Sequence, residues 1–197
     1  MTPAADPLAI TARVGALFEA LGIAYSVGGS IASSLNGEPR TSIDVDIVVM
    51  LEAPKIDPLI DALEPEFYVE RPGLERAIVR RSSANIIHRE SSLKIDLFVA
   101  GGSVMDEDTL RRRVGVAVGD PPARIYVHTP EDILLQKLRW YRMGGEVSDR
   151  QWRDVLGIVR VQERRLDRAY LSVGATRLAV EDLLARALRE GGDDTVW

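Results

Sequence analysis

The sequence contains no cysteine and only two histidines, His88 and His128, among its 197 residues. The absence of cysteine excludes disulfide bonds, thiolate nucleophiles and cysteine-bound zinc. Because imidazoles are so few, we expect any metal ion to be held by oxygen ligands.

The chain also lacks a run of about 18 apolar residues, the length that a membrane-spanning helix needs. Its first residues show neither the basic start nor the apolar segment of a secretory leader. We therefore expect a cytoplasmic protein with no membrane partner. With 46% apolar residues, the chain can bury a core large enough for one catalytic domain with a helical appendage.

Basic residues are not in excess, and the formal net charge is −5. This balance argues against a protein that coats nucleic acid indiscriminately, because such binding is driven by counterion release from phosphates. Residues 1–105 carry 9 basic and 14 acidic side chains, whereas residues 137–168 carry 9 basic and 5 acidic ones. Two interpretations stay open: an acidic metal site beside an anion site, or a solvated arginine-rich helix face.

The spacing of apolar residues predicts mixed helices and strands up to residue 128 and helices thereafter, an α/β fold with a C-terminal helical domain. The predicted strands are 23–27, 43–50, 67–69, 84–89, 93–99, 114–118 and 124–127. The predicted helices are 6–21, 31–35, 56–63, 74–80, 148–161, 167–173 and 176–190. A further helix begins at Thr129-Pro130, where a threonine cap precedes a proline at the first helical position. We place the domain boundary there, between 1–128 and 129–197.

Two carboxylates interrupt the apolar strand 43–50. Strand alternation places Asp44 and Asp46 on one face, with Cα atoms about 7 Å apart. Like charges this close repel, and a Mg²⁺ ion bound by both carboxylates would relieve the repulsion. The alternative is two acids at the solvent end of an edge strand.

A third carboxylate, Asp96, lies in the apolar strand 93–99, in which Lys94 is the other charged residue. If this strand pairs beside 43–50, Asp96 comes within reach of the same ions, because neighbouring strands are about 4.8 Å apart. Three carboxylates could then hold two metal ions for an in-line displacement at phosphorus. The alternative is a strand-end acid paired with a neighbouring base.

Gly28, Gly29 and Ser30 connect a predicted strand to a predicted helix. Glycines let the backbone approach a phosphate closely, helix N-terminal amides favour it, and the Ser30 hydroxyl can add a hydrogen bond. The same residues also suit an ordinary strand-to-helix connection.

These motifs together resemble the DNA polymerase β-like nucleotidyltransferase superfamily. The resemblance rests on Val27-Gly28-Gly29-Ser30 followed by Ile43-Asp44-Val45-Asp46-Ile47. It implies a mixed sheet, Mg²⁺ ions bound by Asp44 and Asp46, and Asp96 as a metal ligand and candidate base. It also implies transfer of a nucleoside monophosphate from a nucleoside triphosphate such as ATP, with release of pyrophosphate.

Four segments are similar to the AbiEii-type branch, which includes bacterial toxins of toxin–antitoxin systems. They are Ser30-Ile31-Ala32, Arg40-Thr41-Ser42-Ile43-Asp44, residues 129–138 and Arg153-Asp154-Val155-Leu156. The resemblance does not identify the acceptor. RNA, such as tRNA, or a protein is the leading hypothesis, and RNA is favoured because the basic segment 137–168 could guide a phosphate backbone. A toxin role would imply a cognate antitoxin as partner. Two alternatives stay open: nucleotidylation of a small molecule such as an aminoglycoside, or a catalytically silent binding partner with the same fold.

Lys137 is one of only three lysines and projects within the apolar stripe of the helix that begins at 129–130. It either snorkels to the edge of the stripe or points toward the β- and γ-phosphates of the triphosphate. His88 is expected on the surface and Arg111 to Arg113 at the solvated end of a helix. Trp152 is expected in the core of the helical domain.

Overall fold

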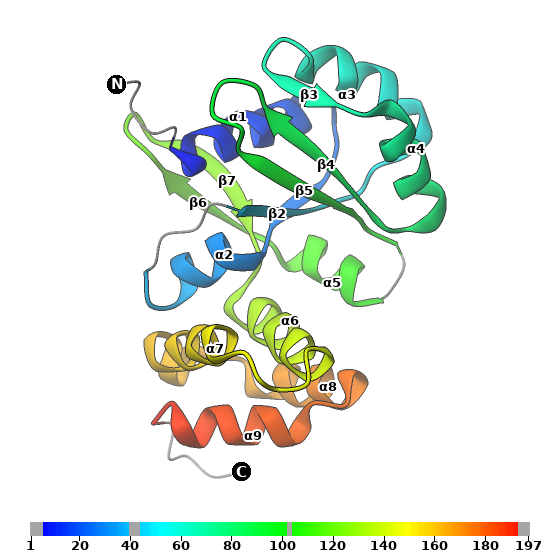
Figure 1. Cartoon of the computed structure of the whole chain (residues 1–197). Helices are drawn as coiled ribbons and strands as arrows, with labels where there is room; N and C mark the ends of the chain where they lie inside the picture. The colour runs from blue at the N-terminus through cyan, green and yellow to red at the C-terminus, as the bar shows by residue number, and fades with distance from the viewer. Residues whose placement is uncertain (1–5, 40–43, 102–103, 193–197) are drawn as a thin grey trace. The chain divides into compact units, whose positions relative to one another are not determined.

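The computed structural model of the chain describes residues 6–39, 44–101 and 104–192. In these residues seven strands form one mixed sheet of order β3-β4-β5-β2-β1-β7-β6 (Figure 1). The strands are β1 Tyr25–Val27, β2 Asp44–Val49, β3 Phe67–Val69, β4 Ser83–His88, β5 Lys94–Val99, β6 Val114–Val118 and β7 Ala123–Val127. The pairs β2–β5 and β1–β7 are parallel, and the other pairs are antiparallel. The predicted α/β fold with a mixed sheet is confirmed.

The helices fall between the strands and after the last of them. They are α1 Pro7–Ala20, α2 Gly29–Asn36, α3 Ile56–Leu63, α4 Arg71–Arg80, α5 Val104–Arg112, α6 Pro130–Met143, α7 Asp149–Gln162, α8 Arg168–Leu178 and α9 Glu181–Glu190. Side-chain caps explain several starts: Asp6 accepts from the Leu8 amide at α1, and Thr129 accepts from the Asp132 amide at α6. The predicted start at Thr129-Pro130 is confirmed.

The chain divides into two compact units. Unit 1 comprises residues 1–30 and 42–128, and unit 2 comprises 31–41 and 129–197. The sequence pattern did not predict that residues 31–41 belong to unit 2, because it placed all of 1–128 in one domain. Arg40 to Ile43, which carry part of the predicted motif, lie outside the described residues.

Unit 1 contains the sheet, with apolar packing on both faces. On one face Phe18 of α1 packs against Tyr25 of β1, whose strand partner is Val49. On the other face Leu110 of α5 packs with Val48 and Ala100. Helix α3 packs against β3, and helix α4 packs against β4 (Figure 1). The sheet is therefore packed on both faces.

Unit 2 is built around α6, which packs against α7, α8 and α9. The segment after α2 joins these helices through close backbone contact: a Cβ added at Gly37 would lie 2.8 Å from the Ile158 amide nitrogen of α7. The Gln162 side chain also donates to the Asn36 carbonyl at 2.6 Å. These contacts explain why residues 31–41 belong to unit 2.

Two helix predictions need correction. The helix predicted to end at 173 continues to Leu178, and the break falls at Ala179, whose φ is 53°. Gly174 does not end the helix but lies within α8. It allows close packing on α6, since an added Cβ would lie 2.3 Å from Leu135 Cδ1. The range of helix α5 was not predicted, although Arg111 to Arg113 were expected at a helix end, because its apolar residues are too sparse to reveal a helical period.

In the described part of the chain, every helix is too short or too polar to span a membrane.

Candidate active site

The acidic residues come together through the parallel pairing of β2 and β5. In this register Asp46 lies opposite Asp96, and Asp44 lies opposite Lys94. Neighbouring strands are about 4.8 Å apart, and residues in register project on the same face. Because β2 lies between β5 and β1, the alternative of an edge strand is wrong.

The acids lie toward the exposed beginning of β2 and β5, whose later residues are mostly buried. Asp44 is exposed and Asp46 and Asp96 are half-buried, whereas Val45, Ile47 and Ile95 on the opposite face are fully buried. Burial of those apolar neighbours fixes the register, because a slip of one residue would turn the carboxylates into the core. The core of unit 1 therefore holds the carboxylates in place.

Gly29 makes the space in which the Asp46 carboxylate lies. A Cβ added at Gly29 would lie 1.8 Å from Asp46 Oδ2, and the residue has a φ of 53°. Both observations require glycine. The turn and the Asp-x-Asp strand, which are separate in the sequence, thus form one site in unit 1.

The turn also contacts β2 through its backbone. The Gly28 amide donates to the Asp46 carbonyl at 2.8 Å, so this amide is engaged within the protein. Helix α2 then begins at Gly29, with Ser30 in its first turn. The first amides of a helix lack partners within it, which makes this terminus suitable for a phosphate.

Lys94 lies on the acidic face, which is formed by Asp44, Asp46 and Asp96. Its Nζ lies 2.8 Å from Asp96 Oδ2, and the two side chains are 46% and 22% exposed. The hydrogen bond and charge of Asp96 raise the pKa of Lys94, with smaller contributions from Asp44 and Asp46. The alternative considered for Asp96, pairing with a neighbouring base, is therefore present in this structure.

The donor set suits a hard divalent cation. Asp44, Asp46 and Asp96 offer carboxylate oxygens from paired strands, the ligands that Mg²⁺ prefers. Within 6–39, 44–101 and 104–192, no three His, Cys, Asp or Glu side chains are grouped so that they could hold a metal ion as they stand. In this arrangement Asp96 is paired with Lys94 instead. The residue types and their register fit Mg²⁺, and a rearrangement of these side chains would be needed to bring all three together.

Lys137 has a partner that the sequence did not reveal. It belongs to α6 in unit 2, and its Nζ lies 2.8 Å from Asp154 Oδ2 of α7. The two side chains are only 9% and 7% exposed. Lys137 is therefore part of a buried ion pair, and its predicted role in binding the triphosphate stays a prediction.

Both histidines are buried. His88 is buried, not on the surface; its Nδ1 lies 2.8 Å from Ser91 Oγ and its ring packs against Phe67. It shares the buried face with Ile86, whereas Asn85 is the register partner of Asp96. His128 is also buried, and burial lowers its pKa to about 4. It is neutral near pH 7, with Nδ1 2.8 Å from Ser26 Oγ.

The remaining candidates have structural contacts. Arg111 pairs with Asp108 at the end of α5, as expected of a solvated helix end. The Arg113 guanidinium lies 4.9 Å from the centre of the Tyr126 ring. Trp152 is buried and its indole donates to Glu190 at 2.7 Å, which agrees with the predicted core position.

We expect Gly29→Ala to destabilise the protein and to displace Asp46. A non-glycine residue in the left-handed region costs about 1–2 kcal/mol, and the new Cβ would overlap the Asp46 carboxylate. Thermal unfolding in EDTA and divalent-cation binding measure the two effects. Gly145→Ala is a matched control, because Gly145 has a φ of 74° and no atom within 4 Å of the added Cβ. Equal behaviour of the two variants would show that the contact with Asp46 is unimportant.

The structure was compared with known proteins. No protein-family model matches the chain, and no curated protein sequence matches it significantly. Among solved structures, it is similar to an antigenic nucleotidyltransferase-like protein from Paracoccidioides brasiliensis, with 16% identity, a TM-score of 0.55, and coverage of 92% of this chain and 91% of that one. It is also similar to the antibiotic-resistance factor ANT(2'')-Ia, with 11% identity, a TM-score of 0.53, and coverage of 94% and 99% respectively. The chain therefore has the fold of the nucleotidyltransferases.

Proposed function

We propose that the protein transfers a nucleoside monophosphate from a nucleoside triphosphate to an acceptor hydroxyl, in a reaction that depends on Mg²⁺. One observation carries this proposal: the glycine turn and the Asp-x-Asp strand meet in unit 1, with Gly29 in contact range of the Asp46 carboxylate. A phosphate-binding helix terminus beside a set of carboxylates is the pairing that nucleotidyl transfer needs.

Each residue has a defined part in the proposal. Asp44, Asp46 and Asp96 would hold Mg²⁺, which neutralises charge on the phosphates and favours deprotonation of the acceptor hydroxyl. Gly29 and Ser30 would orient the triphosphate at the N-terminus of α2. Gly28 serves this site by fixing the turn to β2 through the Asp46 carbonyl. Asp96 is the candidate base that the family resemblance implies.

Two classes of acceptor are proposed. RNA such as tRNA, or a protein, is the first, supported by the basic balance of residues 137–168. A cationic small molecule such as an aminoglycoside is the second, because an acidic face attracts a cation directly. The structure also weakens the argument for RNA. Three of the nine basic residues of segment 137–168 form ion pairs with carboxylates of unit 2; they are Lys137, Arg142 and Arg160.

The AbiEii-type branch stays a prediction from the residue patterns, and so do a toxin role and a cognate antitoxin. They depend partly on Arg40 to Ile43, which lie outside the described residues.

The proposal is tested with each of the four triphosphates labelled at the α-phosphate. The protein is incubated with Mg²⁺ or EDTA and with total RNA, a protein extract or a mixture of aminoglycosides. We expect label to enter one acceptor class only when Mg²⁺ is present, with release of pyrophosphate. Transfer in EDTA would contradict the metal requirement. Binding of triphosphate without transfer to any acceptor would instead favour the catalytically silent alternative.

A further inference from the structure

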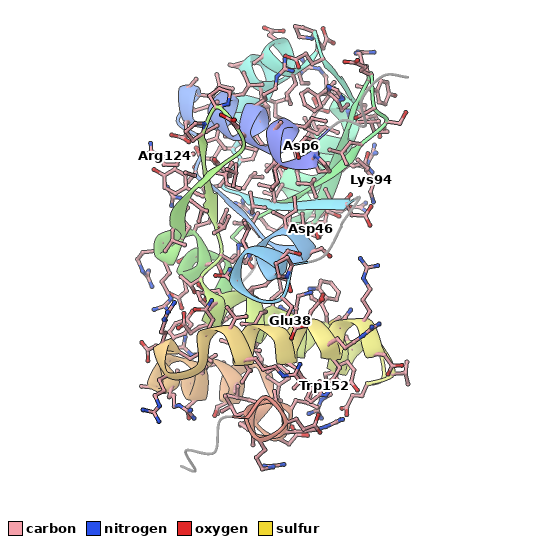
Figure 2. All side chains as sticks on the ribbon, turned by 90° about the vertical axis from the view of Figure 1, so that its left-hand side faces the viewer. Asp6, Glu38, Asp46, Lys94, Arg124 and Trp152 are labelled. Carbon is pink, nitrogen blue, oxygen red and sulfur yellow. The ribbon has the colours of Figure 1, made fainter. Side chains whose placement is uncertain are left out.

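Four charged side chains occupy adjoining positions on two paired strands. Asp44 and Asp46 lie on β2, and Lys94 and Asp96 lie opposite them on β5. Figure 2 labels Asp46 and Lys94, one on each of these neighbouring strands. Residues in register share a face, so the Lys94 ammonium lies among the three carboxylates that are proposed to bind metal.

The Lys94 ammonium forms an ion pair with Asp96, one of the proposed metal ligands. Lys94 Nζ lies 2.8 Å from Asp96 Oδ2. Three carboxylates without a cation would repel one another. Lys94 therefore supplies, in the metal-free protein, part of the positive charge that a divalent ion would supply.

We propose that Lys94 is the resident counter-ion of the metal site and sets its affinity for divalent cations. Lys94 holds one of the two oxygens of Asp96, so the lysine and the metal ion compete for this carboxylate. Lys94 acts through Asp96 and is a positioning residue. This inference rests on the proposed function, because it assumes that the three carboxylates bind metal.

The competing explanation is an ordinary surface ion pair. Lys94 is about half exposed, and exposed ion pairs add little stability. Stability alone therefore cannot separate the two explanations. Metal affinity can, because a surface pair with no link to the site leaves it unchanged, whereas a resident counter-ion weakens it.

The test is the affinity of the EDTA-stripped protein for Mn²⁺ without nucleotide. Carboxylate sites accept Mn²⁺ as well as Mg²⁺, and free Mn²⁺ can be counted by electron paramagnetic resonance. We expect Lys94→Met to bind Mn²⁺ about tenfold more tightly than the wild type, because a unit charge roughly 5 Å from a divalent ion is worth that much even in water. The difference should shrink as salt is added.

Three further variants make the test specific. Lys94→Arg keeps the charge and should bind Mn²⁺ no more tightly than the wild type. Lys55→Met removes the same net charge elsewhere, since the Lys55 ammonium donates to the Leu21 carbonyl, and should leave the affinity unchanged. Lys94→Met combined with Asp46→Asn should lose the gained affinity, which locates the binding at this face.

Unchanged or weaker Mn²⁺ binding by Lys94→Met overturns the inference about Lys94. If the wild type still transfers nucleotide in that case, the proposed function stands and only the counter-ion role fails. If neither protein binds Mn²⁺ and no transfer occurs, both fail.

Discussion

Asp46→Asn is expected to reduce nucleotidyl transfer by more than about a hundredfold while leaving the fold intact. Groups that only orient a metal ligand already cost about 10- to 100-fold when mutated, so loss of a ligand should cost more. Asparagine has nearly the same shape and fits the space that Gly29 provides. Removing one of several neighbouring negative charges also relieves repulsion. Transfer of label from a triphosphate and thermal unfolding in EDTA are the two measurements.

The melting temperature in EDTA decides how this result is interpreted. We expect it to stay level or rise in Asp46→Asn, as in Asp44→Asn. Asp57→Asn is a suitable control, because Asp57 is an exposed acid of α3 that pairs with Arg71. A variant at position 46 that melts well below the wild type would show that this acid is structural, and the metal site would lose its main support.

Lys137→Met is expected to lower the free energy of unfolding by about 3–5 kcal/mol. Lys137 and Asp154 are nearly inaccessible to solvent and joined at 2.8 Å. Removing one member of a buried ion pair takes away a charge partner of the other, and such a change has a cost of this size. For a chain of this length, such a loss lowers the melting temperature by on the order of 10 °C.

Two variants identify the cause of that loss. Lys137→Met combined with Asp154→Leu should recover most of the stability, because apolar side chains then replace both members of the buried ion pair. Arg160→Met removes an exposed partner of Glu38 and should cost less than about 1 kcal/mol. The stable double variant also tests the predicted phosphate role. A KM for triphosphate at least about tenfold higher than in the wild type would support it, whereas an unchanged KM would leave Lys137 with a structural role alone.

Much of the fold could be predicted because its signals are local. Strand alternation located β2 and β5, and the Thr129-Pro130 cap located the start of α6. The meeting of Asp46 with Asp96 followed from the expectation that their strands pair. Such features depend on neighbouring residues or on a single pairing, so the sequence pattern suffices.

The remaining features depend on contacts between distant residues. In the sequence, Lys94 stands out only as a charged residue in an apolar strand. Its position beside the acids follows from the register that places it opposite Asp44. Asp154 could not be matched to Lys137 before α6 and α7 were packed together. Helix α5 did offer one local signal: Asp106 and Glu107 in its first turn and Arg111 and Arg112 in its last turn complement the helix dipole.

The assignment of residues 31–41 to the second unit has a consequence for the order in which the chain can fold. The chain crosses between the units after residues 30, 41 and 128. The partner of Gly37 in helix α7 is made only after residue 149. At about 5–20 residues per second, this delay on the ribosome lasts roughly 5–20 seconds. During that interval the first unit must accommodate an inserted segment whose own partners do not yet exist. Neither unit corresponds to a single uninterrupted stretch of the gene, so cutting between 128 and 129 separates that segment from the helices on which it packs.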